Sequence, residues 1–206
     1  MKLLAFTDVH GDFDILNKLK KYSKDVDITV CAGDITWFSA NLKEVLQAMN
    51  EFESPVIFIH GNHESPEIIK KYLPEFSNLI YLHNGFIRIE KLLFMGYGEG
   101  GFSRVDKKFE KLAKEFGKEI KPTDTTILIT HAPPYNTALD RVGNSKLGVK
   151  SIRRFIENNK ISLCICGHIH ENEGKIDKIN NCIIINPGPF GAKLNTDNPH
   201  EIEFLG

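Results

Sequence analysis

The stretch that decides the fold is Leu3-Leu-Ala-Phe-Thr-Asp8-Val-His10-Gly11, in which a short apolar run ends in polar residues. The run from Leu3 to Phe6 predicts a buried strand, and apolar residues between positions 13 and 22 then recur at helical spacing. Asp12 precedes that helical pattern and is its predicted N-cap. The stretch therefore predicts a β-strand followed by an α-helix, with Asp8 and His10 at the junction.

The strand-helix order is repeated along the chain. Further strands are predicted over residues 28–32 and 56–59 and further helices over 41–52 and 66–72, which favours parallel strands joined by right-handed crossovers. Later strands are expected at 79–82, 86–89, 92–95, 127–129, 162–166, 175–179, 182–185 and, closing one edge, 201–205. Helices are expected over 105–116 and 149–158. No linker-like stretch interrupts this order, so we expect one α/β domain over residues 1–206, with two sheets packed face to face and helices outside.

Composition excludes several classes of protein. The 206 residues carry a net charge of −1 and are 41% hydrophobic and 26% charged, which is typical of a globular protein. This charge predicts no general attraction to nucleic acid or to an anionic membrane, and no apolar segment approaches a membrane span. The four cysteines all lie in apolar runs, which predicts buried, reduced thiols and a cytoplasmic location.

Five of the predicted strands are followed by side chains that can bind metal. A single Asp or His after a strand usually caps a helix or stabilises a turn, but five such segments point to one shared site at the carboxyl ends of the strands. The segments are Asp8-Val-His10, Gly33-Asp34, Gly61-Asn62-His63-Glu64, Thr130-His131 and Gly167-His168-Ile-His170.

The ligand types suit two transition-metal ions. Carboxylate, amide and imidazole groups favour Mn, Fe, Zn, Co or Ni over calcium or structural zinc. One zinc ion needs only four ligands, whereas seven residues are available: Asp8, His10, Asp34, Asn62, His131, His168 and His170. We therefore expect a binuclear centre bridged by Asp34, the carboxylate in the middle of the set. Two adjacent ions suit in-line displacement at phosphorus.

In order and spacing, the five segments resemble the calcineurin-like metallophosphoesterase family across nearly the whole chain. The resemblance implies a four-layer α/β/β/α sandwich of two mixed sheets flanked by helices. It also implies two metal ions, with manganese expected first, and a metal-bridging hydroxide as the nucleophile. By the same resemblance, Asp34 bridges and His63 is the catalytic histidine that binds no metal. The first ion's other ligands would be Asp8, His10 and His170, and the second's Asn62, His131 and His168, with Asn62 also touching the phosphate.

Other polar residues near these segments have simpler expected roles. Asp12 and Asp14 are predicted to start a helix, and His60 is predicted to be structural. Glu64 fits two roles equally, holding a neighbouring site residue or capping the next helix. His83 and His200 are expected at the surface.

The segment 132–148 follows His131 and is long for a connecting loop. Tyr135 could stack on a base, and Arg141 could pair with a phosphate. Contact with the substrate and an ordinary surface loop are equally compatible with the sequence.

These features predict a metal-dependent phosphoesterase that hydrolyses small phosphodiesters or phosphomonoesters. Two alternatives remain open: a nuclease that acts on DNA ends with a partner, and a metal-binding scaffold without activity. The presence of His63 favours an enzyme over a scaffold. The sequence does not determine the metal pair, the preferred ester or the oligomeric state.

Overall fold

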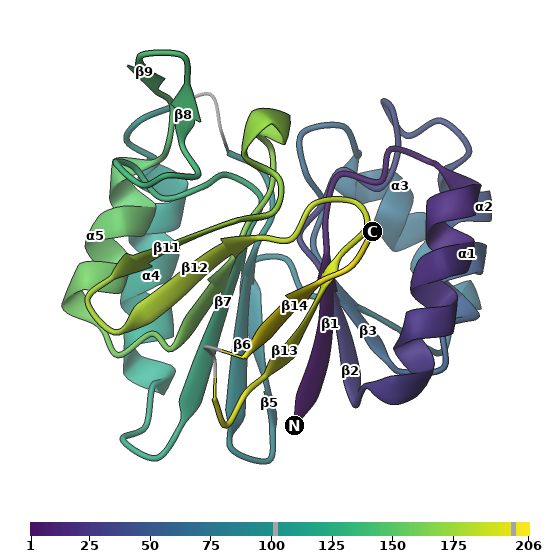
Figure 1. The fold of residues 1–206 in the computed structure, drawn as a ribbon, viewed down its shortest axis with the longest axis horizontal. Coiled ribbons are helices and arrows are strands. Elements are labelled where there is room, and N and C mark those ends of the chain that lie inside the picture. Colours follow the sequence, from purple (N-terminus) through teal and green to yellow (C-terminus); the bar gives the residue numbers. More distant parts are fainter. Residues whose placement is uncertain (101–102, 199–200) are drawn as a thin grey trace.

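Two six-stranded sheets lie at the centre of the computed structural model, which describes residues 1–100, 103–198 and 201–206 (Figure 1). The first sheet has the order β14-β13-β1-β2-β3-β4. Strands β1 to β4 are parallel, β13 pairs antiparallel with β1, and β14 pairs antiparallel with β13 at the edge. The strands are β1 (Lys2–Phe6), β2 (Ile28–Cys31), β3 (Val56–Phe58), β4 (Leu79–Tyr81), β13 (Ala192–Asn195) and β14 (Ile202–Phe204).

The second sheet has the order β11-β12-β10-β7-β6-β5. Its four inner strands are parallel, and the edge strands β5 and β11 are antiparallel to their neighbours. The strands are β5 (Gly85–Ile89), β6 (Leu92–Tyr97), β7 (Thr125–Thr130), β10 (Leu163–Ile165), β11 (Lys175–Ile179) and β12 (Cys182–Asn186).

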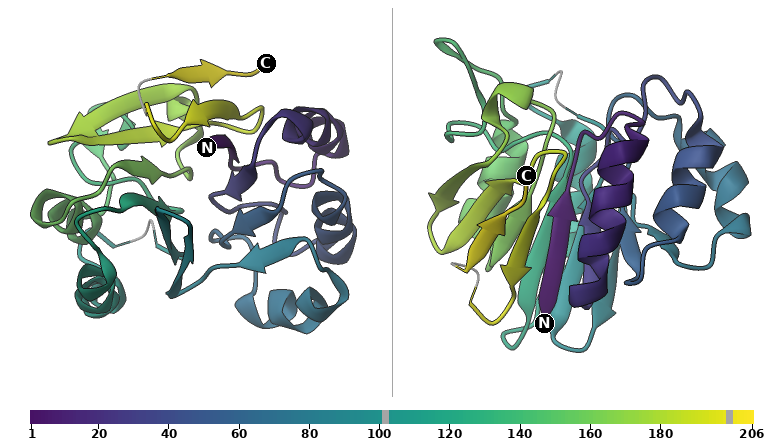
Figure 2. Two further views of the ribbon diagram at one scale, coloured as in Figure 1. Left: turned by 90° about the horizontal axis from the view of Figure 1, so that it is seen from below. Right: turned by 45° about the vertical axis from the view of Figure 1, so that its right-hand side comes forward.

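Helices cover the outer face of each sheet (Figure 2). Helices α1 (Phe13–Tyr22), α2 (Leu42–Asn50) and α3 (Pro66–Tyr72) pack on the first sheet, and α4 (Lys107–Glu119) and α5 (Lys150–Asn158) pack on the second. The predicted α/β/β/α sandwich of two mixed sheets is therefore confirmed. The remaining elements are the short 3-10 helices η1 (Ser23–Asp25), η2 (Leu73–Glu75) and η3 (His170–Asn172) and the small hairpin β8 (Arg141–Val142) and β9 (Ser145–Lys146).

Side-chain caps set where two of the helices begin. Asp12 accepts hydrogen bonds from the backbone N–H groups of Asp14 and Ile15, so α1 begins where the sequence predicts. Asp106 accepts one from Phe109, so the helix expected over 105–116 instead begins at Lys107 and continues to Glu119.

The strands expected at 79–82 and 86–89 are neighbours in the sequence, but they belong to different sheets. Strand β5 pairs with β6 and not with β4, because β4 is the edge of the first sheet. The chain passes between the sheets at Asn84, which has a left-handed φ of 56°.

Two further differences concern elements that the sequence pattern did not reveal. Strand β13 was not predicted, and the hairpin of β8 and β9 lies inside the segment predicted as a loop. The prediction for His200 lies outside the described residues.

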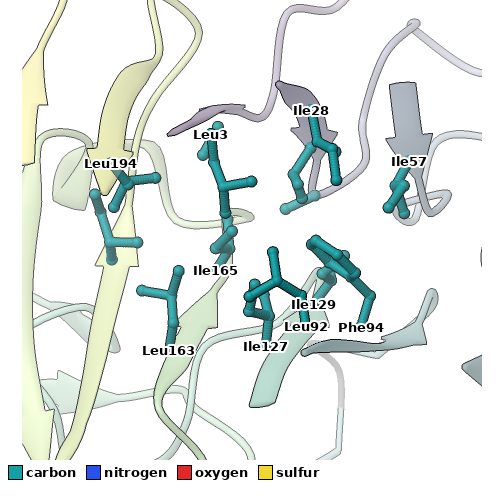
Figure 3. Close-up of a cluster of buried hydrophobic side chains, with 14 of the residues drawn as sticks. Leu3, Ile28, Ile57, Leu92, Phe94, Ile127, Ile129, Leu163, Ile165 and Leu194 are labelled. Carbon is teal, nitrogen blue, oxygen red and sulfur yellow. The ribbon is translucent and has the colours of Figure 1, made fainter. Parts of the chain in front are cut away.

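The main core fills the space between the sheets. Leu3 and Ile28 of the first sheet point toward the second (Figure 3). Phe94 and Ile129 point back from the second sheet, and all four side chains are buried. Two further apolar clusters lie between each sheet and its own helices. The molecule is therefore layered, and the two sheets are held together by apolar contact.

Replacing Phe94 with alanine is expected to lower the free energy of unfolding by about 3–5 kcal/mol, because the ring is fully buried between the sheets. Denaturant unfolding monitored by circular dichroism measures this change. Phe86→Ala on the neighbouring strand β5 is the matched control, because its ring is 45% exposed. Equal losses for the two variants would contradict the assigned core.

The four cysteines are all buried and unpaired by disulfides. Burial raises the pKa of the Cys164 thiol to about 12 and raises the pKa values of Cys31, Cys166 and Cys182 as well. Because thiolates are the reactive form, we expect negligible reaction with a disulfide reagent at neutral pH in the native state. All four should react in denaturant, and a fast-reacting thiol in the native protein would contradict the described burial.

Within the described residues, no helix combines the length and the apolar character needed to cross a membrane.

Candidate metal centre

The loops that follow β1, β2, β3, β7 and β10 converge at one end of the two sheets, which is the upper end in Figure 1. Backbone hydrogen bonds join these loops directly. The N–H of Asp8 donates to Gly33 O at 3.0 Å, and the N–H of His10 donates to Asp34 O at 3.1 Å. The N–H of Gly167 donates to His131 O at 2.9 Å. The N–H of His168 also donates to Asp8 Oδ2 at 3.1 Å, so segments from both halves of the chain meet in one place.

The structure brings Asp8, His10 and His170 together as a first group of donor atoms. The Nε2 atoms of His10 and His170 are 3.2 Å apart, and His170 Nε2 lies 3.7 Å from Asp8 Oδ1. His10 Nδ1 lies 3.2 Å from Thr36 O, which orients the ring so that Nε2 faces the group.

A second group consists of Asn62, His131 and His168. The Asn62 Oδ1 atom lies 3.1 Å from His131 Nε2 and 2.8 Å from His168 Nδ1. His131 is fully buried, and its Nδ1 lies 2.9 Å from Ala32 O. As in the first group, a backbone carbonyl orients the imidazole.

Asp34 lies between the two groups. Its Oδ2 atom is 3.2 Å from His131 Nε2, and donor atoms of Asp8, Asp34 and His131 all lie within 4.8 Å of one another. One carboxylate is thus within reach of donors on both sides, as a bridging ligand requires.

The residues present fit divalent transition metals. The Nε2 atoms of His10 and His170 face each other, an arrangement that a cation between their lone pairs would favour. The donors are imidazole, carboxylate and amide groups, and no cysteine belongs to the groups that could hold an ion in the described chain.

The backbone at this site adopts conformations that residues other than glycine rarely take. Asp8, His10, Asp34 and His168 have φ values of 56°, 46°, 50° and 74°. Such conformations cost about 1–3 kcal/mol each and are concentrated at functional sites. The hydrogen bonds between the loops hold these residues in place.

Two glycines allow the loops to approach this closely. A Cβ atom on Gly61 would lie 2.0 Å from Asp34 Oδ1, and one on Gly167 would lie 2.3 Å from Asp8 Oδ2. The glycines of the Gly61-Asn62-His63 and Gly167-His168 segments are therefore required by contact with the acidic donors.

Charge is tightly coupled within the centre. Burial raises the pKa of Asp34, but the hydrogen bond and charge of His131 and the contacts with His63 outweigh it and lower the pKa to about 2. Burial lowers the pKa of His131, but the hydrogen bond and charge of Asp34 outweigh this and raise it to about 9. Burial and the charge of His131 lower the pKa of His168 to about 4. The Asp34 carboxylate is thus ionised at neutral pH, as a bridging ligand must be.

His63 approaches the centre from the Asp34 side. Its backbone N–H donates to Asp34 Oδ1 at 3.0 Å, and its Nε2 lies 3.8 Å from Asp34 Oδ2. A ring nitrogen of His63 lies within 4.8 Å of donor atoms of His10 and Asp34. The imidazole therefore stands at the edge of the centre.

Glu64 has a structural role that the sequence did not distinguish. Its Oε1 accepts from Thr36 N and Thr36 Oγ1, both at 2.9 Å, and its Oε2 accepts from Gly61 N at 2.9 Å. Burial and the charge of Asp34 raise the pKa of Glu64 to about 7. Glu64 does not cap α3, whose cap is Ser65. It ties the loop after β2 to the loop after β3.

His60 and His83 lie together outside the two donor groups. His60 is buried, its Nδ1 is 2.7 Å from Tyr81 Oη, and its ring contacts that of His83 at 4.4 Å. The expectation that His83 lies at the surface is wrong, because its ring is half-buried among His60, Tyr81 and Tyr97.

In the segment 132–148, Tyr135 lies among cations and not against the donor groups. Arg104, Lys146 and Lys150 lie within 5.0–6.0 Å of the Tyr135 ring. Arg141 is exposed in β8.

Two aromatic residues beside the centre had no motif to mark them. Trp37 stacks on His10 with ring centroids 3.8 Å apart, and Phe38 contacts His63 at 4.4 Å. An aromatic pair three and four residues after Asp34 was the available signal.

Comparison with known proteins agrees with this geometry. The family model for calcineurin-like phosphoesterases matches residues 1–172. The chain belongs to the calcineurin-like phosphoesterase family. It is therefore a metal-dependent phosphoesterase in the general sense.

Individual relatives of this phosphoesterase are similar over most of the chain. An uncharacterized protein of Methanocaldococcus jannaschii is 34% identical over 200 residues, which is 92% of this chain and 88% of that protein. A solved archaeal phosphodiesterase has a TM-score of 0.57 at 17% identity, and the superposition covers 98% of each chain. A dimetal phosphatase from Danio rerio has a TM-score of 0.63 at 11% identity, over 94% of this chain and 91% of that one. The two structures share the fold.

Proposed function

We propose that this phosphoesterase uses two metal ions to hydrolyse small phosphodiesters or phosphomonoesters. The observation that carries the proposal is the pair of donor groups, Asp8/His10/His170 and Asn62/His131/His168, with the Asp34 carboxylate between them. One carboxylate shared by two groups is the arrangement that two-metal displacement at phosphorus needs.

In this proposal each donor group holds one ion and Asp34 holds both. When bound, the two ions would supply a hydroxide nucleophile near neutral pH and neutralise charge on the phosphate. Asn62 uses its Oδ1 toward His131 and His168, which leaves its amide N–H group for a phosphate oxygen. His63 stands beside Asp34 and donates a proton to the leaving oxygen or a hydrogen bond to the phosphate.

The substrate that we propose is small. A net charge of −1 gives the chain no general attraction for the phosphate backbone of nucleic acids. The name of the solved archaeal phosphodiesterase adds support for diester substrates. We further propose manganese as the working metal, activity of the single domain over residues 1–206, and a cytoplasmic location.

Turnover of two chromogenic esters tests the proposal. Metal-free protein is loaded with Mn²⁺, and release of p-nitrophenolate is followed from bis-p-nitrophenyl phosphate and from p-nitrophenyl phosphate. We expect turnover of at least one ester, and the ratio of rates identifies the preferred class.

Two outcomes would favour the alternatives. A protein carrying two ions per chain that turns over neither ester would indicate a scaffold. Tight, salt-sensitive binding of duplex DNA together with cleavage at its ends would indicate a nuclease.

A further inference from the structure

The loop between β2 and α2 exposes two large aromatic side chains beside the candidate metal centre. Trp37 is 50% exposed and Phe38 is 79% exposed. They follow Asp34 by three and four residues, so the strand that delivers the shared carboxylate also delivers these rings. We call Trp37 and Phe38 the aromatic pair.

The aromatic pair lies against two site histidines. The indole of Trp37 is nearly parallel to the His10 imidazole, at 16° with centroids 3.8 Å apart. Its edge-to-face contact with His63 has a centroid distance of 4.8 Å, and Phe38 contacts the same imidazole at 4.4 Å. Both exposed rings therefore contact the imidazole of His63, the proposed proton donor.

The loop is anchored on both sides of the aromatic pair. Before it, Thr36 donates two hydrogen bonds to the buried Glu64 carboxylate at 2.9 Å. After it, the N–H of Ser65 donates to Ser39 Oγ at 3.0 Å, and the N–H of Ala40 donates to Trp37 O at 2.9 Å. The bonds to Glu64 and Ser65 attach the loop to the residues that follow His63, so the backbone of the aromatic pair is held next to the centre.

The backbone is strained at the more exposed residue of the aromatic pair. Phe38 and Ser39 have left-handed φ values of 50° and 61°, which are unfavourable for residues with side chains. With this backbone the Phe38 side chain is exposed, and most of its apolar surface meets solvent. An exposed ring held on a strained, anchored backbone next to a catalytic centre is suited to contact with a ligand.

We propose that Trp37 and Phe38 bind the planar aromatic group of a phosphate ester, either a nucleobase or an aryl ring, on the His63 side of the centre. This inference rests on the proposed function and specifies its substrate class. Stacking on aromatic side chains accepts any planar ring, which makes the aromatic pair selective for aromatic over aliphatic esters and tolerant of which ring is present.

Calorimetric titration of the Mn²⁺-loaded protein with matched ligands tests the proposal without requiring turnover. The ligands are phosphonates, which have no ester bond to hydrolyse: the phosphonate analogues of adenosine 5′-monophosphate and ribose 5-phosphate differ by the nucleobase, and phenylphosphonate and methylphosphonate differ by the aryl ring. We expect the wild-type protein to bind at least one aromatic ligand roughly tenfold or more tightly than its partner. The pair that shows this preference distinguishes a nucleobase from a directly attached aryl group.

Substitutions in the aromatic pair test whether these two residues cause the preference for aromatic ligands. Phe38→Ala and Trp37→Ala should each reduce the ratio of affinities severalfold, whereas Phe38→Tyr should retain it. Phe86→Ala is the matched control, because it removes an exposed phenylalanine from the edge strand β5. Metal content is measured for every variant, since Trp37 contacts His10.

The outcomes separate this inference from the function on which it rests. Equal affinities within both ligand pairs for the wild-type protein, or a preference that survives both alanine variants, would overturn the aromatic site. Absence of ester turnover in the same metal-loaded preparation would instead contradict the proposed function.

Discussion

Replacing His63 with alanine is expected to reduce turnover of bis-p-nitrophenyl phosphate by roughly 10²- to 10⁴-fold, the range typical of a lost general acid or base. The His63 side chain stands at the edge of the centre, with Nε2 3.8 Å from Asp34 Oδ2, and contributes to neither proposed ligand group. Its loss should therefore remove proton donation while both metal ions stay bound. Steady-state kinetics and metal analysis of the same preparation measure the two effects.

His83→Ala is the matched control for this variant. It also removes a half-buried histidine, but one that packs on His60 away from the donor groups. Turnover close to that of the wild-type protein is expected. A His63→Ala protein that keeps wild-type turnover would refute the role of His63, and one that loses its metal would instead identify His63 as a ligand.

Replacing Asp34 with asparagine is expected to reduce metal content as well as turnover. The substitution keeps the size of the side chain but removes the charge placed between the donor groups. Residues that merely position a metal ligand cost about 10- to 100-fold in metal affinity when replaced. We expect a larger loss at Asp34, because the proposal assigns it to both ions, with turnover falling below detection.

Calorimetric titration of the metal-free variant with Mn²⁺ measures this loss of metal affinity. Asp14→Asn is the control, since Asp14 is an exposed acidic residue in the first turn of α1. If Asp34→Asn still bound two ions with wild-type affinity, Asp34 would not bridge them.

Much of the fold could be predicted from local patterns. Leu3–Phe6 and the helix from Phe13 to Tyr22 were recognisable because apolar spacing and the Asp12 cap agree with each other. Strand β13 was not, because Ala192–Asn195 has little apolar character of its own and is held by pairing with β1. The pairing of β5 with β6 and not β4 depends on which sheet each strand joins, and local spacing does not contain that information.

The site residues were predictable for a different reason. Each follows a strand that could be recognised, and parallel strands bring their carboxyl ends to one edge. Asp8 lies beside His170 only when the two sheets pack together. The order of the motifs indicated this arrangement, and the structure has it. Trp37 and Phe38 were missed because an aromatic pair in a sequence normally indicates core. Only the exposure of both rings and the left-handed φ of Phe38 distinguish the aromatic pair from core residues.

The central claim, a phosphoesterase that needs two metal ions, is tested most directly by titrating the metal-free protein with Mn²⁺ while measuring turnover of bis-p-nitrophenyl phosphate and p-nitrophenyl phosphate. Turnover should rise with added metal and reach its maximum when two ions are bound per chain. Full turnover with one ion bound would contradict the binuclear centre, and no turnover of either ester with two ions bound would contradict the enzymatic function.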